Sequence, residues 1–179
     1  MKNLRSTIRT SDQGSKVFLR TLLPDDVTPA YVKWLNDPEM TKYLESRHED
    51  HTFESCLAYA ENTYKSESDE LFCIIYDNVH VGNVKIGNIH PIYFNGDVGI
   101  MIDKLYWGYG ISKIAISLVE EIAFDQLKLH KLYAGAYKNN IASIRAFSHN
   151  GWQIVGEMKE HCIIDEVYIN KIWMEKLNC

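Results

Sequence analysis

The sequence has little of what disordered, nucleic-acid-binding or membrane-spanning chains need. Only 4 of its 179 residues are proline, which argues against long disordered tracts. It contains no run of Lys or Arg, and its formal net charge is −5, so the basic face of nucleic-acid binders is not expected. No stretch approaches the roughly 20 apolar residues that span a bilayer. We therefore expect a soluble protein with neither a nucleic-acid nor a membrane partner.

The sequence also lacks the residue spacings of metal and redox sites. No two cysteines have the spacing of a zinc or thioredoxin-like motif. His48 and His51 have no carboxylate or cysteine partner at a metal-binding spacing. The polar N-terminus has no apolar signal-peptide segment, and free thiols are typical of a reducing compartment, so we expect a cytoplasmic protein without a metal. The cysteines are Cys56, Cys73, Cys162 and Cys179.

What the sequence does contain is the composition of one globular domain. Hydrophobic residues make up 46% and charged residues 24% of the chain, which is ordinary for a fold with a packed core. Residues 1–15 are polar and are expected to form a loose lead-in. Residues 16–179 are expected to form a single domain.

Strand-like and helix-like segments are interspersed along this domain, which predicts an α+β class. Asn95–Gly96 is a strong hairpin signal, so a turn is placed there. In the helix after residue 110, apolar residues recur at helical spacing from Ile111 to Ile122. Strands are expected at 16–22, 71–76, 79–89, 97–102, 131–137, 153–164 and 167–176, and further helices at 30–36, 52–65 and 140–149.

A glycine loop lies between the strand at 97–102 and the helix that follows it. Residues 107–113 read WGYGISK, with glycine at Gly108 and Gly110. Glycine allows positive φ and close approach of backbone N–H groups to a ligand, and a helix N-terminus adds partial positive charge. Together these features suit a phosphate. The loop lacks the P-loop spacing and the third glycine of a dinucleotide motif, and a tight turn without a ligand explains the same residues equally well.

A second motif follows the strand at 131–137. Asn140 and Ser143 fit the pattern Asn-x-x-Ser/Ala, Phe147 supplies an aromatic seven residues after the Asn, and Gly151-Trp152 ends the motif. With the glycine loop in register, the chain resembles the GNAT superfamily of acyl-CoA-dependent N-acetyltransferases from residue 16 to its C-terminus. It is similar to the branch that acetylates ribosomal-protein N-termini and amino sugars, which also has an early Trp-Leu-Asn-Asp-Pro, here residues 34–38.

The resemblance implies a fold, an activity and a donor. The fold is α+β, with a mixed, mostly antiparallel sheet of about six or seven strands flanked by about four helices. The activity is transfer of an acetyl group from acetyl-CoA to a primary amine by direct attack. The acceptor is expected to be a nucleotide-linked amino sugar of surface-polysaccharide synthesis in a bacterium. A protein N-terminus, a catalytically inactive CoA-binding module and a homodimer all stay open.

The resemblance also implies candidate catalytic residues. Asp97 opens the strand where related enzymes often place an acid, so it is a candidate base, or else only a hairpin residue. Many members carry a tyrosine general acid where Phe147 stands, so Tyr137, Tyr106, Tyr109 or solvent would have to serve. Asn140 would cap its helix or bond the pantetheine arm.

The resemblance also implies contact residues for both substrates. Aromatic and histidine side chains suit stacking on a sugar or base, and Arg47 or Lys85 would have to bind a nucleotide diphosphate. The expected acceptor residues are Trp34, Tyr43, His90 and Tyr93. The expected acetyl-CoA contacts are Ile100, Met101, Ile102, Trp107, Gly108, Tyr109, Gly110, Ile111, Ser112, Lys113, Asn140, Ser143 and Phe147.

Overall fold

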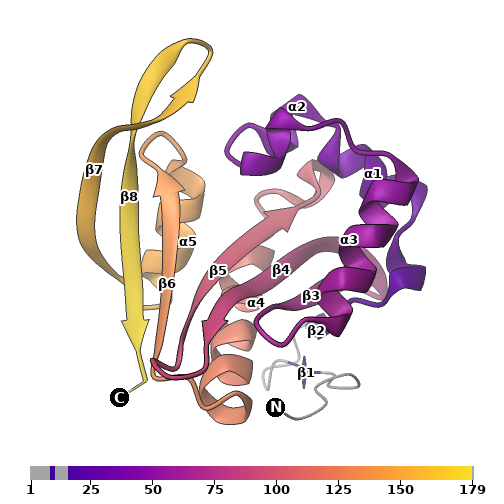
Figure 1. Cartoon of the computed structure of the whole chain (residues 1–179), viewed down its shortest axis with the longest axis horizontal. Coiled ribbons are helices and arrows are strands. Elements are labelled where there is room, and N and C mark those ends of the chain that lie inside the picture. Colours follow the sequence, from indigo (N-terminus) through magenta and orange to yellow (C-terminus); the bar gives the residue numbers. More distant parts are fainter. Residues whose placement is uncertain (1–8, 11–15, 179) are drawn as a thin grey trace.

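The computed structural model describes residues 9–10 and 16–178, and in these residues eight strands form one sheet. The strands are β1 (Arg9–Thr10), β2 (Val17–Thr21), β3 (Glu70–Tyr76), β4 (Val79–His90), β5 (Asn95–Ile102), β6 (Lys131–Tyr137), β7 (Gln153–Ile164) and β8 (Val167–Leu177). Their order across the sheet is β1-β2-β3-β4-β5-β6-β8-β7 (Figure 1). Neighbours are antiparallel except β5 and β6, which are parallel. The predicted mixed, mostly antiparallel α+β fold is confirmed.

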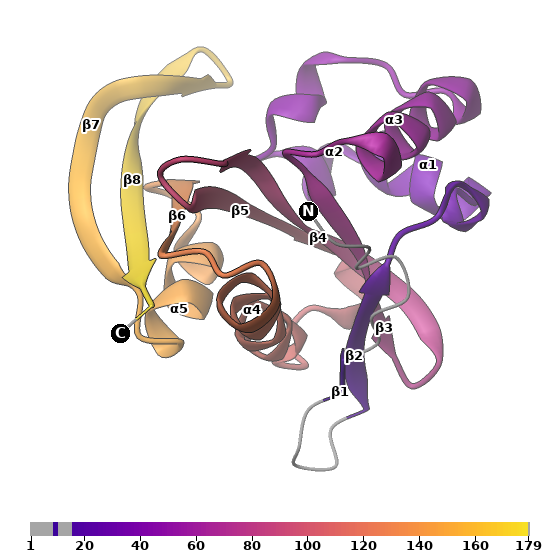
Figure 2. The same cartoon turned by 60° about the horizontal axis from the view of Figure 1, so that its bottom comes forward.

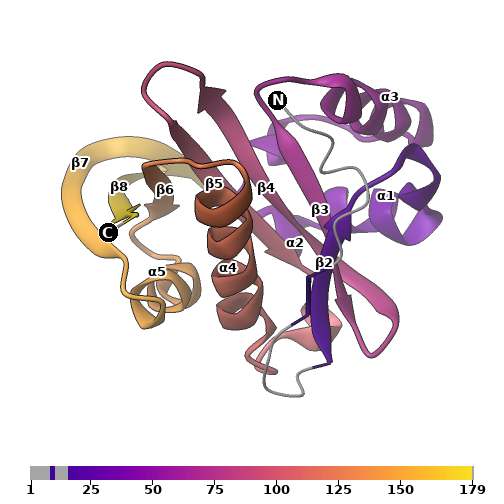
Figure 3. The ribbon, with the colours of Figure 1, turned by 90° about the horizontal axis from the view of Figure 1, so that it is seen from below.

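Helices cover both faces of this sheet. The helices are α1 (Pro29–Leu35), α2 (Pro38–Thr41), α3 (Phe53–Lys65), α4 (Ile111–Glu121) and α5 (Ile141–His149). Figures 2 and 3 show α1, α2 and α3 on one side of the sheet and α4 and α5 on the other. The described residues therefore hold one α-helix more than the expected four, because the short α2 begins directly after α1 at Pro38.

The two layers of helices enclose two hydrophobic cores. Strand β3 contributes to both, because successive side chains of a strand point to opposite faces. Ile74 belongs to the core under α4, whereas Cys73 and Ile75 belong to the core under α1 and α3. The uninterrupted apolar run at 71–76 therefore forms a strand buried on both faces. The predicted stripe of α4 is buried at Ile111, Ala115, Leu118 and Ile122 and half-buried at Ile114.

The hairpin between β4 and β5 does not turn where the sequence pattern placed it. The turn lies at residues 91–94, and Asn95 and Gly96 are the first residues of β5. Phe94 takes the left-handed conformation (φ 51°), and the imidazole Nδ1 of His90 accepts N–H bonds inside the turn. Gly96 has another role, because a Cβ there would lie 3.0 Å from Ile86 Cγ2. Close strand packing therefore explains this glycine.

The expected N-terminal lead-in lies mostly outside the described residues, which leave out 1–8, 11–15 and 179. Within it, β1 is described, and Arg9 and Thr10 pair with Leu19 and Phe18 of β2. In the part of the chain that is described, no helix is both long and apolar enough to cross a membrane.

Candidate functional site

The parallel strands β5 and β6 separate before they end. Their register runs only from Asn95 opposite Lys131 to Asp97 opposite Tyr133. Beyond it, residues 100–102 of β5 still pair with β4. Within the described residues they have no ladder partner toward β6, so this backbone edge faces the opening between the strands (Figure 1).

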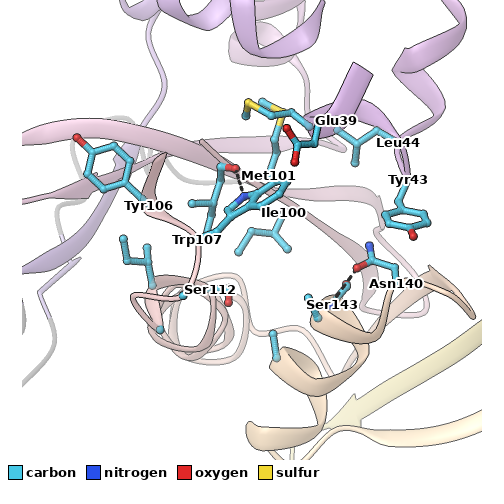
Figure 4. A pocket seen from close by; sticks show the side chains of 17 residues that line it. Glu39, Tyr43, Leu44, Ile100, Met101, Tyr106, Trp107, Ser112, Asn140 and Ser143 are labelled. Atoms are coloured by element: carbon cyan, nitrogen blue, oxygen red, sulfur yellow. Dashed lines mark hydrogen bonds between the residues drawn. The ribbon is translucent and has the colours of Figure 1, made fainter. Parts of the chain in front are cut away.

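A cavity of about 300 Å³, the fork cavity, occupies this opening. Its walls come from β5, the glycine loop, the first turns of α4 and α5, and α2 with the residues that follow it (Figure 4). The sequence motifs did not point to Glu39, Met40 or Leu44, which α2 and its loop bring to the cavity from a distant part of the chain. Predicted residues on its lining are Tyr43, Ile100, Met101, Ile102, Tyr106, Trp107, Gly108, Gly110, Ile111, Ser112, Asn140 and Ser143.

Helices α4 and α5 both begin at this cavity, and α4 is the only described α-helix without a side-chain cap. Side-chain oxygens of Thr28, Asp37, Thr52 and Asn140 accept N–H bonds at the starts of α1, α2, α3 and α5. The N-cap residue of α4 is Gly110, which has no side chain to do this. The first N–H groups of a helix have no intrahelical acceptor, so α4 presents donors and partial positive charge toward the cavity.

Both loop glycines have backbone conformations that favour glycine. Gly108 has a φ of 84° and Gly110 a φ of 74°. A Cβ on either residue would have no heavy atom within 4 Å. The protein therefore leaves open space above this backbone, which a ligand can approach closely.

Polar contacts of Trp107 and Lys104 hold the walls of the fork cavity. The indole Nε1 of Trp107 donates to the Ile102 carbonyl at 2.8 Å (Figure 4). The ammonium of Lys104, in the short helix η3 (Lys104–Tyr106), lies 2.7 Å from Asp37 and 3.1 Å from Glu39. Hydrogen bonding between Lys104 and Asp37 raises the pKa of the amine and lowers the pKa of the carboxyl. The glycine loop is thereby tied to the start of α2.

A second cavity of about 480 Å³ lies on the α3 side of the sheet and meets the fork cavity. Leu44, Ile100 and Met101 line both cavities. Three carboxylates follow in the segment after α2: Glu45, in the short helix η2 (Glu45–His48), and Glu49 and Asp50. We call this second space the carboxylate cavity.

The basic residues near the carboxylate cavity are already engaged. Arg47 donates to the Leu44 carbonyl, the Tyr137 hydroxyl and the Ile163 carbonyl. Lys85 forms an ion pair with Asp69 at 2.7 Å. Both cations proposed from the sequence for a nucleotide diphosphate therefore have partners within the protein.

Tyr137 lies beside this cavity rather than on its lining. Its hydroxyl accepts from Arg47 Nη1 at 2.7 Å and donates to Glu45 Oε1 at 2.9 Å. Burial of the ring, together with the Glu45 carboxylate, raises the pKa of Tyr137 to about 12. The phenol is therefore a hydrogen-bond donor at neutral pH.

Several predicted residues lie away from both cavities. Asp97 lies in the paired part of β5, where its Oδ1 accepts from Asn88 at 2.7 Å. The aromatic and histidine side chains expected to surround the acceptor are not brought together. Trp34 is buried against His80, whereas His90 and Tyr93 stack on each other in the β4–β5 hairpin. Of the expected acetyl-CoA contacts, Tyr109 and Lys113 are exposed and Phe147 is buried against Trp152.

The three described cysteines are buried, and the described metal-binding residue types do not cluster. Cys56, Cys73 and Cys162 are free and buried, and burial raises the pKa values of the Cys56 and Cys73 thiols. Their thiolate forms are thus disfavoured, although Cys56 lines the carboxylate cavity. No group of three His, Cys, Asp or Glu side chains among the described residues could hold a metal ion.

Comparison with known proteins places this geometry in a family. The family model described as "Acetyltransferase (GNAT) domain" matches residues 16–153. Acetyltransferase PseH of Campylobacter jejuni is 23% identical over 72% of this chain and 78% of its own length. Spermidine N(1)-acetyltransferase of Escherichia coli is 28% identical over 60% of this chain and 58% of its own length.

A solved structure shares the fold at low sequence identity. RimL, a ribosomal L7/L12 alpha-N-protein acetyltransferase solved with coenzyme A, superposes with a TM-score of 0.86 over 96% of this chain and 98% of its own, at 16% identity. Fold and family model agree: the chain belongs to the GNAT acetyltransferase family and is an acyltransferase with acetyl-CoA as its donor.

Proposed function

We propose that the chain acetylates a primary amine of a small cationic molecule that carries two or more amino groups. The observation that carries this proposal is the junction of the two cavities. One offers helix and loop N–H groups, the other is lined by carboxylates, and they meet at Ile100 and Met101. An acyl donor in the first cavity and a cationic amine in the second would therefore meet on β5.

The fork cavity fits acetyl-CoA by its chemistry. The uncapped N-terminus of α4 and the open backbone at Gly108 and Gly110 suit a pyrophosphate. The edge of residues 100–102 suits the amide-rich pantetheine arm, which can pair as an added strand would. Asn140 lines the cavity and caps α5, its Oδ1 accepting from the Ser143 N–H at 3.2 Å. Asn140 can therefore cap α5 and also contact the pantetheine arm.

The carboxylate cavity favours a cationic acceptor. Glu45, Glu49 and Asp50 outnumber its one lysine, Lys85, which is paired with Asp69. Carboxylates attract ammonium groups and raise their local concentration. The similarity to a spermidine N(1)-acetyltransferase supports the same class of acceptor.

The cavity gives less support to a nucleotide-linked amino sugar. A diphosphate would add two or more negative charges beside three carboxylates, which is unfavourable. The two cations that could offset them are engaged: Lys85 on the lining pairs with Asp69, and the Arg47 guanidinium donates to Leu44, Tyr137 and Ile163. An amino sugar and an Ala-initiated peptide are therefore the competitors in the test.

The acceptor class is tested by competition. We expect acetyl-CoA with equal concentrations of spermidine, a UDP-4-amino sugar and an Ala-initiated peptide to give mainly acetylspermidine, measured by mass spectrometry. Faster acetylation of the sugar or the peptide would overturn the proposed acceptor class. It would leave the family assignment intact.

Charge removal in the carboxylate cavity should weaken acceptor binding. We expect Glu49→Gln to raise the KM for spermidine about fivefold, with kcat little changed, because a partly exposed ion pair contributes up to about 1 kcal/mol. The effect should shrink as salt is added. The matched control is Glu61→Gln, which changes a half-exposed carboxylate of α3 that pairs with Lys65 and lines neither cavity. Equal KM values for the two variants would contradict a role of Glu49 in acceptor binding.

The reaction should proceed without an acetyl-cysteine intermediate. The thiols of Cys56 and Cys73 are buried and their pKa values are raised, so neither is an activated nucleophile. We expect the variant with all four cysteines changed to Ala to keep turnover within a few fold. Intact-protein mass spectrometry of the wild-type protein after mixing with acetyl-CoA should detect no added acetyl group. An acetylated cysteine would refute direct attack.

A further inference from the structure

We propose that Glu45 is the catalytic base that removes a proton from the acceptor ammonium; this assignment rests on the proposed acetyl transfer to an amine. Its position is the first argument. Leu44, the preceding residue, lines both cavities, and Glu45 itself lines the carboxylate cavity. Of the three carboxylates of that cavity, Glu45 is next in sequence to a residue of the junction.

The second argument is the way Glu45 is held. Its Oε1 accepts a hydrogen bond from the Tyr137 hydroxyl at 2.9 Å, and that hydroxyl accepts from Arg47 at 2.7 Å. Arg47 is fixed in turn by the Leu44 and Ile163 carbonyls at 2.8 and 3.0 Å. One carboxylate oxygen is thus anchored, and Oε2 has no partner among the described residues. That second oxygen can accept from a substrate ammonium.

Asp97, the other candidate base, has a different environment. It lies where β5 and β6 are still paired, and its Oδ1 accepts from the Asn88 amide. It lines neither the fork cavity nor the carboxylate cavity. The geometry therefore gives Glu45 better access to an amine that approaches Ile100 and Met101.

The proposed step balances without a further reactant. The ammonium gives one proton to the Glu45 carboxylate, and the freed nitrogen lone pair attacks the acetyl carbonyl carbon. The C–N bond forms, the attacking nitrogen releases its second proton to solvent, and the C–S bond breaks. Glu45 returns its proton to solvent, and CoA leaves as a thiolate that takes up a proton. A CoA thiol resembles cysteine in acidity, so solvent can supply that proton. This requires no tyrosine in place of Phe147.

The titratable and charged groups near Glu45 come from several elements. Arg47 belongs to the same short helix, Tyr137 to β6, and Cys162 of β7 packs in one cluster with Tyr137. The other titratable groups on the lining of the carboxylate cavity are Tyr31, Glu49, Asp50, His51, Cys56, Tyr59 and Lys85. A pH profile must therefore be compared between variants, because several of these groups titrate.

The deciding experiment compares Glu45→Gln with Asp97→Asn over a range of pH. Each variant receives acetyl-CoA and whichever of spermidine, the UDP-4-amino sugar and the Ala-initiated peptide the wild type acetylates fastest. General base catalysis contributes about 10²–10⁴-fold, so we expect kcat of Glu45→Gln to fall about 100-fold or more at pH 7.5. The KM for spermidine should rise by no more than the about fivefold expected for Glu49→Gln, since each change removes one carboxylate charge from the same cavity, so the larger loss should be in kcat.

The shape of the pH profile separates a base from a structural residue. Without a base, the rate depends on the neutral amine in solution, whose fraction grows about tenfold per pH unit below the amine pKa. The kcat/KM of Glu45→Gln should therefore rise about tenfold per pH unit, more steeply than the kcat/KM of wild type. The ratio of wild-type to variant kcat/KM, which we call the deficit, should therefore become smaller as the pH rises. Asp97→Asn should follow the wild-type profile.

The outcomes are distinct for each hypothesis. A deficit of Glu45→Gln that stays constant with pH, or wild-type activity of this variant, would overturn the assignment. The assignment would also be overturned if Asp97→Asn, and not Glu45→Gln, had a deficit in kcat/KM that became smaller as the pH rises. Preference for the peptide or sugar over spermidine would refute the proposed acceptor class, while the comparison of variants still tests Glu45 on that preferred amine.

Discussion

Gly110→Val should weaken CoA binding by about tenfold or more, or about 1.4 kcal/mol, while the chain still folds. Gly110 begins α4 with a φ of 74°, and no protein atom lies within 4 Å of the position of a Cβ. The added side chain would fill the space in which we propose that the pyrophosphate lies. It would also disfavour the left-handed backbone that aims the first N–H groups of α4 into the fork cavity.

A matched variant separates these effects from general strain. Gly151, after α5, has a φ of 80° and likewise no heavy atom within 4 Å of a built Cβ. It does not line the fork cavity. Gly151→Val should therefore lower the free energy of unfolding to a similar degree but keep CoA affinity, as measured by isothermal titration calorimetry. Undiminished CoA binding by a folded Gly110→Val protein would remove the loop from the binding site.

The fold was predictable where local patterns and burial agree. The strand expected at 131–137 is the observed β6, and the helix expected at 140–149 is α5 with Asn140 as its N-cap. The prediction of a turn at Asn95–Gly96 was wrong, because Gly96 lies within β5, where a Cβ would crowd Ile86 on the neighbouring strand. A contact of that kind is set by strand pairing, which a dipeptide signal does not report.

The candidate site was predictable only in its local half. The glycine loop and Asn140 belong to motifs with their own spacing, and the structure places both on the fork cavity. Glu45 has no such motif. It meets Tyr137 of β6, 92 residues further along the chain, only because the fold brings the segment after α2 next to β6.

The positions of aromatic side chains were also not predictable from local sequence motifs. The sequence pattern assigns Trp34 and Phe147 to ligand contacts, but the structure buries both, at 5% and 2% exposure. A large apolar side chain stabilises a core as readily as it binds a ligand. The choice between these roles depends on which helix packs over it, and Phe147 packs against Trp152 at a ring-centroid distance of 4.6 Å.

The helices that carry the cofactor half of the site are joined by a buried polar network. Glu120 of α4 is 7% exposed. Its carboxylate accepts from the Trp152 indole and the Lys176 ammonium, and Lys176 also donates to the Asn150 carbonyl at 2.6 Å. The Asn150 amide donates to the Lys113 carbonyl at 3.0 Å. Strand β8, the end of α5 and helix α4 are thereby held together.

Lys176→Met should lower the free energy of unfolding by about 3 kcal/mol or more, because it leaves the Glu120 carboxylate buried without its cation. The double variant Glu120→Leu/Lys176→Met should recover most of this loss, since no buried charge remains. Lys16→Met is the control: its ion pair with Asp77 is exposed, so about 1 kcal/mol or less should be lost. Urea unfolding measures all three. Equal losses for Lys176→Met and Lys16→Met would show that the network does not stabilise the junction of α4, α5 and β8.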